Sequence, residues 1–401
     1  MDLKTECRKS ISRTVPTINC QLVLILLNMF RRVLYLLNFA ALMALLLACL
    51  SCYISPSVVW FLSFLGLGFP WVILSVVIFA LLWAVWRRKM FWVNTVALLL
   101  SVPMIRTVVA LHGVATKEHG VKLMTYNVKN FDLYNWTGNK ETRMKIMQLI
   151  AKENPDVICF QEFYTDDVDF LNTEYLRDSL GYTYHFVSAT YDKWYKRDTD
   201  KKPHHLQWGL AIFSKYEITD TGVVDFGKAM GNKCIYADLK IMGMPLRLYN
   251  THLQSIHLGY DDYDTIEELS ENQNTNWYRV RNILRKMKHA SAKRATQAQA
   301  VANAMQQYEG NKMICGDFND APVSFSYHTI SRGLQDAFIE KGRGFGKSFA
   351  NKFGWFRIDY VLAAPSIKIN SYRSIPAELS DHYPVVVEVV TPSRPAPKGS
   401  K

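Results

Sequence analysis

The chain has 401 residues, of which 49% are hydrophobic and 20% charged, and its formal net charge is +12. Residues 1–112 hold 10 Lys and Arg against 2 Asp and Glu, whereas the remaining residues hold 37 against 33. The length allows more than one structural unit, and the second part carries only +4 (37 − 33), so the overall charge is no argument for a DNA-binding surface.

The stretch 33–86 contains no Asp, Glu, Lys, Arg or His. A membrane-spanning helix needs about 20 apolar residues, so this stretch predicts an all-α transmembrane region and excludes both a soluble bundle and a cleavable signal peptide. Pro56 divides the stretch, Gly and Pro at 66–70 favour a bend, and a charged break at 87–89 precedes a further apolar run. The predicted transmembrane region is 33–112, with three spans at about 33–54, 58–86 and 91–111.

Positive charge flanks these predicted spans unevenly. The segment 1–32 carries six Lys or Arg and the break at 87–89 carries three, whereas the turn at 55–57 carries none. By the positive-inside rule, the basic N-terminal segment and the second connection are cytoplasmic. Three spans then place the rest of the chain on the non-cytoplasmic side of an inner or plasma membrane, which is the periplasmic side in a bacterium.

Strand-like and helix-like runs follow between about residues 120 and 390. Runs rich in Val, Ile, Tyr and Phe and bounded by Gly, Pro, Asn or Asp predict strands at 121–128, 156–161, 182–188, 208–214, 234–241, 245–251, 312–316, 357–363 and 384–390. Helices are predicted at 140–153, 166–180, 275–308 and 324–332. Many strands with few helices predict an α/β fold of two packed sheets with helices outside, in a domain at 113–390. The Pro- and Lys-rich tail 391–401 is predicted to be disordered.

Acidic, amide and imidazole side chains stand at the ends of successive predicted strands. In Gly316-Asp317-Phe318-Asn319, the acid and the amide are two residues apart, so they point the same way from the strand end. The other strand ends carry Asn127, Gln161-Glu162, Asn250-Thr251-His252, Arg357-Ile358-Asp359 and Ser380-Asp381-His382. One such residue is more often a turn or cap residue, but six complementary groups predict a site with its own chemistry.

In this order the strand-end groups resemble the endonuclease/exonuclease/phosphatase superfamily, which includes exonuclease III, deoxyribonuclease I and neutral sphingomyelinases. The resemblance covers roughly 121–390 and leaves the predicted membrane spans outside. It implies a four-layer α/β sandwich, in which two packed mixed sheets are flanked by helices and the site lies where the loops of both sheets meet. It also implies hydrolysis of phosphoesters with the help of a divalent metal.

The resemblance implies a metal site around one carboxylate. Glu162 is the best candidate ligand for Mg²⁺, or Mn²⁺ in its place, because these hard cations prefer carboxylate oxygens and keep several waters. Asn127 and Asp381 would complete or brace the site. The metal would neutralise charge on the phosphoryl group during the attack of water.

The resemblance also implies roles in proton transfer and phosphate binding. His382 would act on protons or on the phosphate, with Asp359 orienting its imidazole and favouring the charged form. Asp317 would align or deprotonate the attacking water, while Asn319 and His252 would donate hydrogen bonds to phosphoryl oxygens. Which of Asp317 and His382 is the general base is left open.

The substrate is left open between nucleic acid and a lipid headgroup. The phrase Trp355–Asp359 departs from the aromatic-Cys-Asp-Arg phrase of inositol polyphosphate 5-phosphatases, which argues against inositol phosphates. Basic residues in the loop 193–207 and along the helix 275–308 favour nucleic acid or anionic lipid, although each segment is also consistent with an ordinary solvated surface. The complete set of acid, base and ligand residues argues against a non-catalytic scaffold. We therefore expect a membrane-anchored phosphodiesterase of unspecified oligomeric state. A nuclease-like activity is ranked first, and a sphingomyelinase-like activity on lipids is the alternative.

Overall fold

The computed structural model describes residues 17–112, 120–196, 202–227, 232–256, 276–350 and 356–390, together with single positions between 258 and 268. The predicted disordered tail 391–401 lies outside these residues. The chain forms two compact units. The helical unit comprises the chain up to Leu47 and Phe69–Leu100, and the sheet unit comprises Ala48–Gly68 and all residues from Ser101 onwards.

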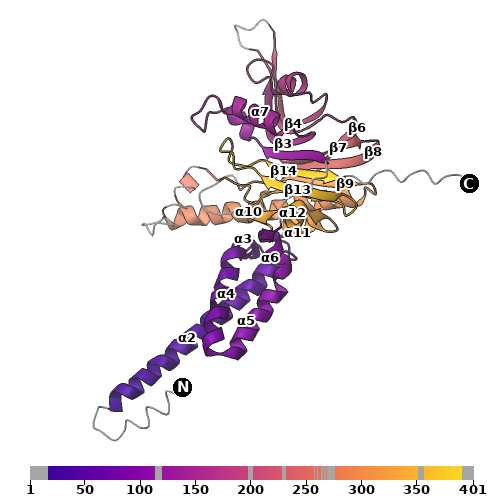
Figure 1. Cartoon of the computed structure of the whole chain (residues 1–401). Coiled ribbons are helices and arrows are strands. Elements are labelled where there is room, and N and C mark those ends of the chain that lie inside the picture. Colours follow the sequence, from indigo (N-terminus) through magenta and orange to yellow (C-terminus); the bar gives the residue numbers. More distant parts are fainter. Residues whose placement is uncertain are drawn as a thin grey trace, which may run out of the picture. The chain divides into compact units, whose positions relative to one another are not determined.

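The helical unit is built from apolar helices (Figure 1). They are α2 (Thr17–Leu50), whose last residues belong to the sheet unit, α4 (Phe69–Trp86) and α5 (Arg88–Leu100). Two helical stretches among the described residues, Leu22–Leu50 and Phe69–Trp86, are long and apolar enough to cross a membrane. A third would exist only if α5 and α6 (Val102–Val108), which meet at a bend of 60°, form one span. The three predicted spans are therefore two clear candidates and one broken helix pair.

The boundaries of the predicted spans differ from the helices for local reasons. The first helix begins well before residue 33 and includes Arg31 and Arg32, whose long aliphatic stems are compatible with an apolar helix surface. The second predicted span is broken between α3 (Leu62–Leu67) and α4, where Gly68 is followed by Pro70 in the first turn of α4. In the third, Pro103 lies in the first turn of α6 and cannot continue the hydrogen bonding of α5.

Two six-stranded mixed sheets form the centre of the sheet unit. The first sheet has the order β13-β14-β2-β3-β5-β4 and the second has the order β10-β12-β9-β8-β7-β6. The first sheet contains β2 (Val121–Asn127), β3 (Val157–Asp166), β4 (Tyr184–Tyr195), β5 (His204–Ser214), β13 (Lys368–Ser374) and β14 (Val385–Val390). The second contains β6 (Ile218–Val224), β7 (Lys233–Ile241), β8 (Met244–His252), β9 (Lys312–Asp317), β10 (Gln335–Asp336) and β12 (Asp359–Ala363). The pairs β2–β3 and β8–β9 are parallel, and the remaining pairs are antiparallel.

Three apolar layers hold this unit together. The central layer lies between the sheets and contains, for example, Cys159 and Ile212 from the first sheet and Ile235 and Cys315 from the second. An outer layer packs α7 (Thr142–Glu153) against the first sheet. Another packs α10 (Trp277–Gln306) and α11 (Phe325–Ser331) against the second, so the helices lie on opposite sides of the sheets (Figure 1). The predicted sandwich of two mixed sheets flanked by helices is confirmed.

Some elements differ from the prediction. β6 and β13 were not predicted because both are edge strands with many polar side chains, which weakens the apolar signal of a strand. The predicted loop 193–207 is largely the two arms of the β4–β5 hairpin, of which 197–201 lie outside the described residues. The predicted helix 166–180 is reduced to α8 (Asn172–Glu174) and a π-helical turn at Tyr175–Ser179, because β3 continues to Asp166.

The segment Ala48–Gly68, which connects two of the apolar helices, packs on the rest of the sheet unit. Ser51 Oγ donates a hydrogen bond to the carbonyl of Val323 at 3.3 Å, and the Tyr53 ring lies 4.6 Å from the ring of His328. A Cβ atom at Gly66 would lie 2.2 Å from the same Val323 oxygen, so only glycine fits there. The segment that follows α2 is thus fixed within the sheet unit.

The segment after α5 is fixed to the same unit. Arg357 is buried, forms an ion pair with Asp336 at 2.8 Å, and donates a hydrogen bond to the carbonyl of Thr107 in α6 at 2.8 Å. The strand β1 (Ala110–Leu111) then pairs with β11 (Arg343–Gly344). Arg357, in one of the strand-end phrases, therefore has a structural role: it neutralises a buried acid and attaches α6 to the sheets.

Candidate functional site

The predicted site residues come from the ends of strands in both sheets. In the second sheet, Asp317 at the end of β9 pairs in register with Asp359 at the start of β12 and with His252 at the end of β8. Three neighbouring strands therefore place these side chains in a row. Asn127 ends β2 in the first sheet, where its register partner on β3 is Gln161.

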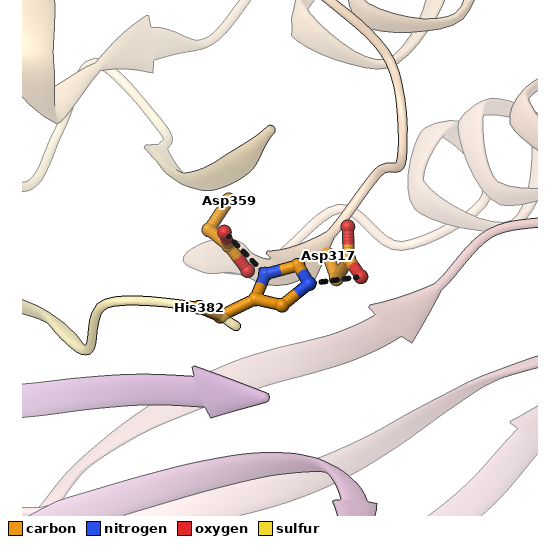
Figure 2. Close-up of side chains that lie close together, drawn as sticks. All are labelled: Asp317, Asp359 and His382. Atoms are coloured by element: carbon orange, nitrogen blue, oxygen red, sulfur yellow. Dashed lines mark hydrogen bonds and ion pairs between the residues drawn. The ribbon is translucent and has the colours of Figure 1, made fainter. Parts of the chain in front are cut away.

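An imidazole lies between two carboxylates at the centre of the site. His382 Nδ1 is 2.9 Å from Asp359 Oδ2, and His382 Nε2 is 3.7 Å from Asp317 Oδ2 (Figure 2). All three side chains are buried. His382 is held from behind by Phe349, which forms a backbone bridge with it and places its ring 5.3 Å from the imidazole.

This arrangement determines which groups carry protons. Burial alone would lower the pKa of His382, but the charges of Asp359, Asp317 and Asp381 outweigh burial and raise it to about 10. Burial raises the pKa of Asp317 to about 6, although the His382 charge opposes this shift. At neutral pH the site therefore holds an imidazolium at His382 beside the carboxylate of Asp317.

Asn319 positions Asp317. Its backbone N–H donates to Asp317 Oδ1 at 2.8 Å, and its Nδ2 donates to Asp317 Oδ2 at 3.1 Å and to the carbonyl of Leu253 at 3.0 Å. Asn319 is in the left-handed backbone region, with φ 52°, a conformation that asparagine tolerates better than most residues. His252 Nε2 approaches the same carboxylate at 3.6 Å. The predicted donation by Asn319 and His252 to phosphoryl oxygens stays a prediction.

Glu162 projects from a β-bulge. The pairing of β3 with β5 shifts between Phe160 and Phe163, and Glu162 takes a positive φ of 51° in this interval. Such strained residues cost about 1–3 kcal/mol and tend to occur at functional sites. Asn127 Nδ2 donates to Glu162 Oε1 at 3.4 Å and to Asp317 Oδ2 at 3.2 Å. It therefore connects a carboxylate of the first sheet with a carboxylate of the second.

Asp381 is paired with a lysine that no sequence pattern singles out. Lys129 Nζ lies 2.9 Å from Asp381 Oδ2. Burial favours the neutral acid, but the charges of His382 and Lys129 outweigh it and lower the pKa of Asp381. Lys129 opens a turn, Lys129–Asp132, in which all four non-glycine residues have φ between 44° and 59°. A strained left-handed turn therefore supplies a cation to the site.

The endonuclease/exonuclease/phosphatase family model matches residues 124–382, well over half of the chain and every predicted site residue. The chain belongs to this family. A second model, for a domain of unknown function, matches residues 31–108, the region of the apolar helices. No curated protein matches the chain. The resemblance to the superfamily is confirmed, and membership supports a phosphoesterase, in a family that generally uses divalent metals.

Solved structures with a similar fold are distant in sequence. An endonuclease/exonuclease/phosphatase family protein from Bacteroides thetaiotaomicron is 16% identical with a TM-score of 0.48, covering 68% of this chain and 96% of that one. A mannosyl-6-phosphatase from the same organism is 18% identical with a TM-score of 0.45, covering 67% and 99%. A humanized D. rerio TDP2 is 14% identical with a TM-score of 0.46, covering 68% and 99%.

The residues present in this family member fit a divalent cation beside Glu162. Burial and the charge of Asp381 raise the pKa of Glu162, which means that its negative charge is poorly compensated in the metal-free protein. A hard cation held by Glu162 and Asp381 would remove this penalty. Among the described residues, Asp317, Asp359 and His382 also have ligand atoms within 4.8 Å of one another. In this trio the two ring nitrogens of His382 already face the two carboxylates, so the trio suits proton transfer and phosphate binding better.

Other residues in the same strand-end phrases connect the two sheets. Asn250 Nδ2 donates to the carbonyls of Phe160 and Ala211 in the first sheet at 2.9 and 3.0 Å. Gln161 Nε2 returns a hydrogen bond to Asn250 Oδ1 at 2.7 Å. Both side chains are fully buried. These two polar residues therefore fix one sheet against the other beneath the site.

Two serines support the site; the sequence analysis named Ser380 only as part of a strand-end phrase and did not select Ser348. Ser348 Oγ accepts hydrogen bonds from the backbone N–H groups of Ile358 and Asp359, both at 3.0 Å, and so positions the start of β12. Ser380 Oγ donates to the carbonyl of Asn127 at 2.8 Å, which connects the loop before β14 to the end of β2. Ser348 lies in a loop without periodicity, so no pattern could have identified it.

Proposed function

We propose that this protein is a membrane-anchored phosphodiesterase that depends on a divalent metal. The observation that carries the proposal is the buried row of Asp359, His382 and Asp317 next to Glu162 and Asp381. Asn127, Glu162 and Asp381 would hold the metal, Mg²⁺ or Mn²⁺, which supplies positive charge to the phosphoryl group. The protein's own residues would position the phosphate and move the proton of the attacking water.

The two groups left open by the sequence take separate roles in this proposal. With its pKa raised to about 6, Asp317 is ionised at neutral pH yet basic enough to accept a proton from water. With its pKa raised to about 10, His382 is a poor base but a charged donor toward a phosphoryl oxygen. Asp317 is therefore the proposed general base, and His382 the proposed phosphate-binding cation, oriented by Asp359.

Nucleic acid is the first proposed substrate class and a lipid phosphodiester is the alternative. A pocket of about 180 Å³ next to Asp381 is lined by Lys129 and the half-exposed Trp136. The Trp136 ring lies 4.9 Å from Lys129 Nζ. An aromatic ring beside a cation is suited to stacking a base next to its phosphate. Anchoring at a bilayer favours the lipid alternative.

Metal removal tests the proposed activity. We expect the full-length protein in detergent to hydrolyse bis(p-nitrophenyl) phosphate with Mg²⁺ or Mn²⁺, and chelation to reduce the rate by at least about 10³-fold, reversibly. Parallel assays with a DNA oligonucleotide, an RNA oligonucleotide and sphingomyelin vesicles assign the substrate class. Hydrolysis that continues at full rate in excess chelator would contradict the proposal.

Three membrane spans are also part of the proposal. The contacts of Ser51 with Val323 and of Thr107 with Arg357 mean that the chain leaves the sheet unit before α4 and rejoins it at α6. A segment that returns to the same side crosses a bilayer an even number of times, so α4 and the α5–α6 pair both cross or neither does. Because α4 has the length and composition of a span, we take both to cross.

Together with α2 and the basic residues before it, this topology puts the sheet unit on the non-cytoplasmic side. Alkaline phosphatase, which is active only outside the cytoplasm, is expected to be active when fused after Lys401. A matched fusion after Lys89 is expected to be inactive, because the α4–α5 connection would lie in the cytoplasm. The opposite pattern would overturn the topology.

A further inference from the structure

The long helix α10 extends beyond the core that it covers. It has 30 residues, seven of them Lys or Arg, and none is Asp or Glu. Between Trp277 and His289 only Ile283 is buried, whereas the other buried residues of α10 begin at Ala290, and Ala298, Val301 and Met305 among them pack on the second sheet. The first half of α10 is therefore a basic helix with most of its surface uncovered, and Figure 1 shows it on the same side of the sheets as α3 and α11.

One face of this half combines apolar and basic side chains. Trp277, Arg281, Leu284 and Lys288 recur at the helical spacing i, i+4, i+7 and i+11, so they form one row along about 16 Å of helix. Trp277 is 75% exposed and Leu284 is 41% exposed. On a surface that faces only water, an exposed Trp and Leu aligned with cations stay in contact with water. At a membrane interface, the apolar side chains enter the acyl boundary and the cations meet the headgroups.

Lys288, the last residue of this row, shows which part of the chain the row faces. Lys288 Nζ lies 5.5 Å over the ring of Trp60, which belongs to the segment connecting α2 to α4. A segment that connects two membrane spans lies at the surface of the bilayer, and Trp is enriched at that level. The row on α10 therefore ends at the segment that connects two of the proposed membrane spans.

We propose that the first half of α10 lies on the bilayer surface and binds anionic phospholipid headgroups. Trp277 and Leu284 would enter the boundary of the acyl chains, and Arg281, Arg285 and Lys288 would contact lipid phosphates. This inference rests on the proposed membrane anchoring and is independent of the proposed hydrolase activity.

Two other basic residues of α10 are engaged within the protein and are not part of this surface. Lys286 forms an ion pair with Asp262 at 2.6 Å, and the buried Arg294 forms one with Asp320 at 3.2 Å. Nucleic acid would satisfy the remaining cations, but it would leave Leu284 in water. The alignment of Leu284 and Trp277 with the cations therefore favours lipid.

Hydrogen exchange on the full-length protein tests the proposal. The protein is reconstituted into nanodiscs of phosphatidylcholine with or without phosphatidylglycerol, and exchange of the backbone amides of 277–289 is followed by mass spectrometry. We expect exchange to be slower in the anionic nanodiscs by roughly tenfold, because each basic side chain near an anionic surface contributes a several-fold effect. High salt is expected to abolish the difference.

A charge-reversal variant identifies the residues. The triple variant R281E/R285E/K288E is expected to lose the protection, while the control K140E/K152E/K368E, in exposed lysines away from α10, is expected to keep it. Hydrolysis of bis(p-nitrophenyl) phosphate should be the same in both, so a failure of the hydrolase proposal does not affect the result. Equal exchange in both lipid compositions would overturn the inference, as would protection by an added oligonucleotide but not by anionic lipid.

Discussion

Glu162→Gln is expected to lower the metal-dependent hydrolysis of bis(p-nitrophenyl) phosphate by about 10³-fold, equivalent to about 4 kcal/mol of transition-state stabilisation. The amide keeps the size of the side chain and its neutral contacts in the bulge of β3. It removes the negative charge of the carboxylate that we propose as the main metal ligand. The comparison with wild type is made at saturating Mg²⁺ and at Mn²⁺, to separate weakened metal binding from lost chemistry.

The same substitution has a distinctive effect on stability. Because burial and Asp381 raise the pKa of Glu162, its ionised form is disfavoured in the folded protein, and replacing it by a neutral amide should maintain or raise Tm in chelator. In Mg²⁺, wild type should gain Tm through binding to the folded state, and the variant should gain little. Glu217→Gln, in an exposed ion pair with Lys240, is the matched control and should behave as wild type in both conditions. Full Mg²⁺-dependent turnover by Glu162→Gln would rule out its assignment as a ligand.

The proximity of Asp317, Asp359 and His252 could be predicted only in part from the sequence. Each ends or begins a strand whose apolar pattern is clear, and the family resemblance placed them in one site. The register that pairs Asp317 with both neighbours depends on β9 lying between β8 and β12, and β12 follows β9 only after more than forty residues. Local periodicity carries no information on such long-range order.

The site residues that sequence analysis missed share a physical reason. Lys129 reaches Asp381 because four consecutive non-glycine residues adopt a left-handed turn, a conformation with no sequence signature and an intrinsic cost. Ser348 acts through backbone N–H groups of another segment, so its role depends on tertiary contacts alone. Composition did predict the apolar helices, but the breaks at Gly68 and Pro103 decide how many candidate spans they form.

Asp359→Asn is expected to reduce turnover by about three orders of magnitude while preserving metal binding. Asp359 lies 2.9 Å from His382 Nδ1 and is the largest of the charges that raise the pKa of the imidazole. An amide in its place removes that charge and allows the buried ring to become neutral, which weakens donation to a phosphoryl oxygen. Mg²⁺ should still raise the Tm of this variant, unlike that of Glu162→Gln, so the two substitutions separate the proton network from the metal site.

The effect of Asp359→Asn on stability is expected to depend on pH. His382 has a folded-state pKa of about 10, against about 6.5 in an unfolded chain, so its stabilising contribution is complete below about pH 6.5 and is lost as pH rises through about 10. In chelator, the difference in unfolding free energy between wild type and Asp359→Asn should therefore narrow by about 1 kcal/mol per pH unit across that window. The exposed pair of Asp192 with His205 provides the matched control, Asp192→Asn, for which solvent screening predicts a small difference at every pH. If the difference in unfolding free energy between wild type and Asp359→Asn stays constant from pH 7 to 10, His382 is not held as an imidazolium. His382 would then be the general base in place of Asp317.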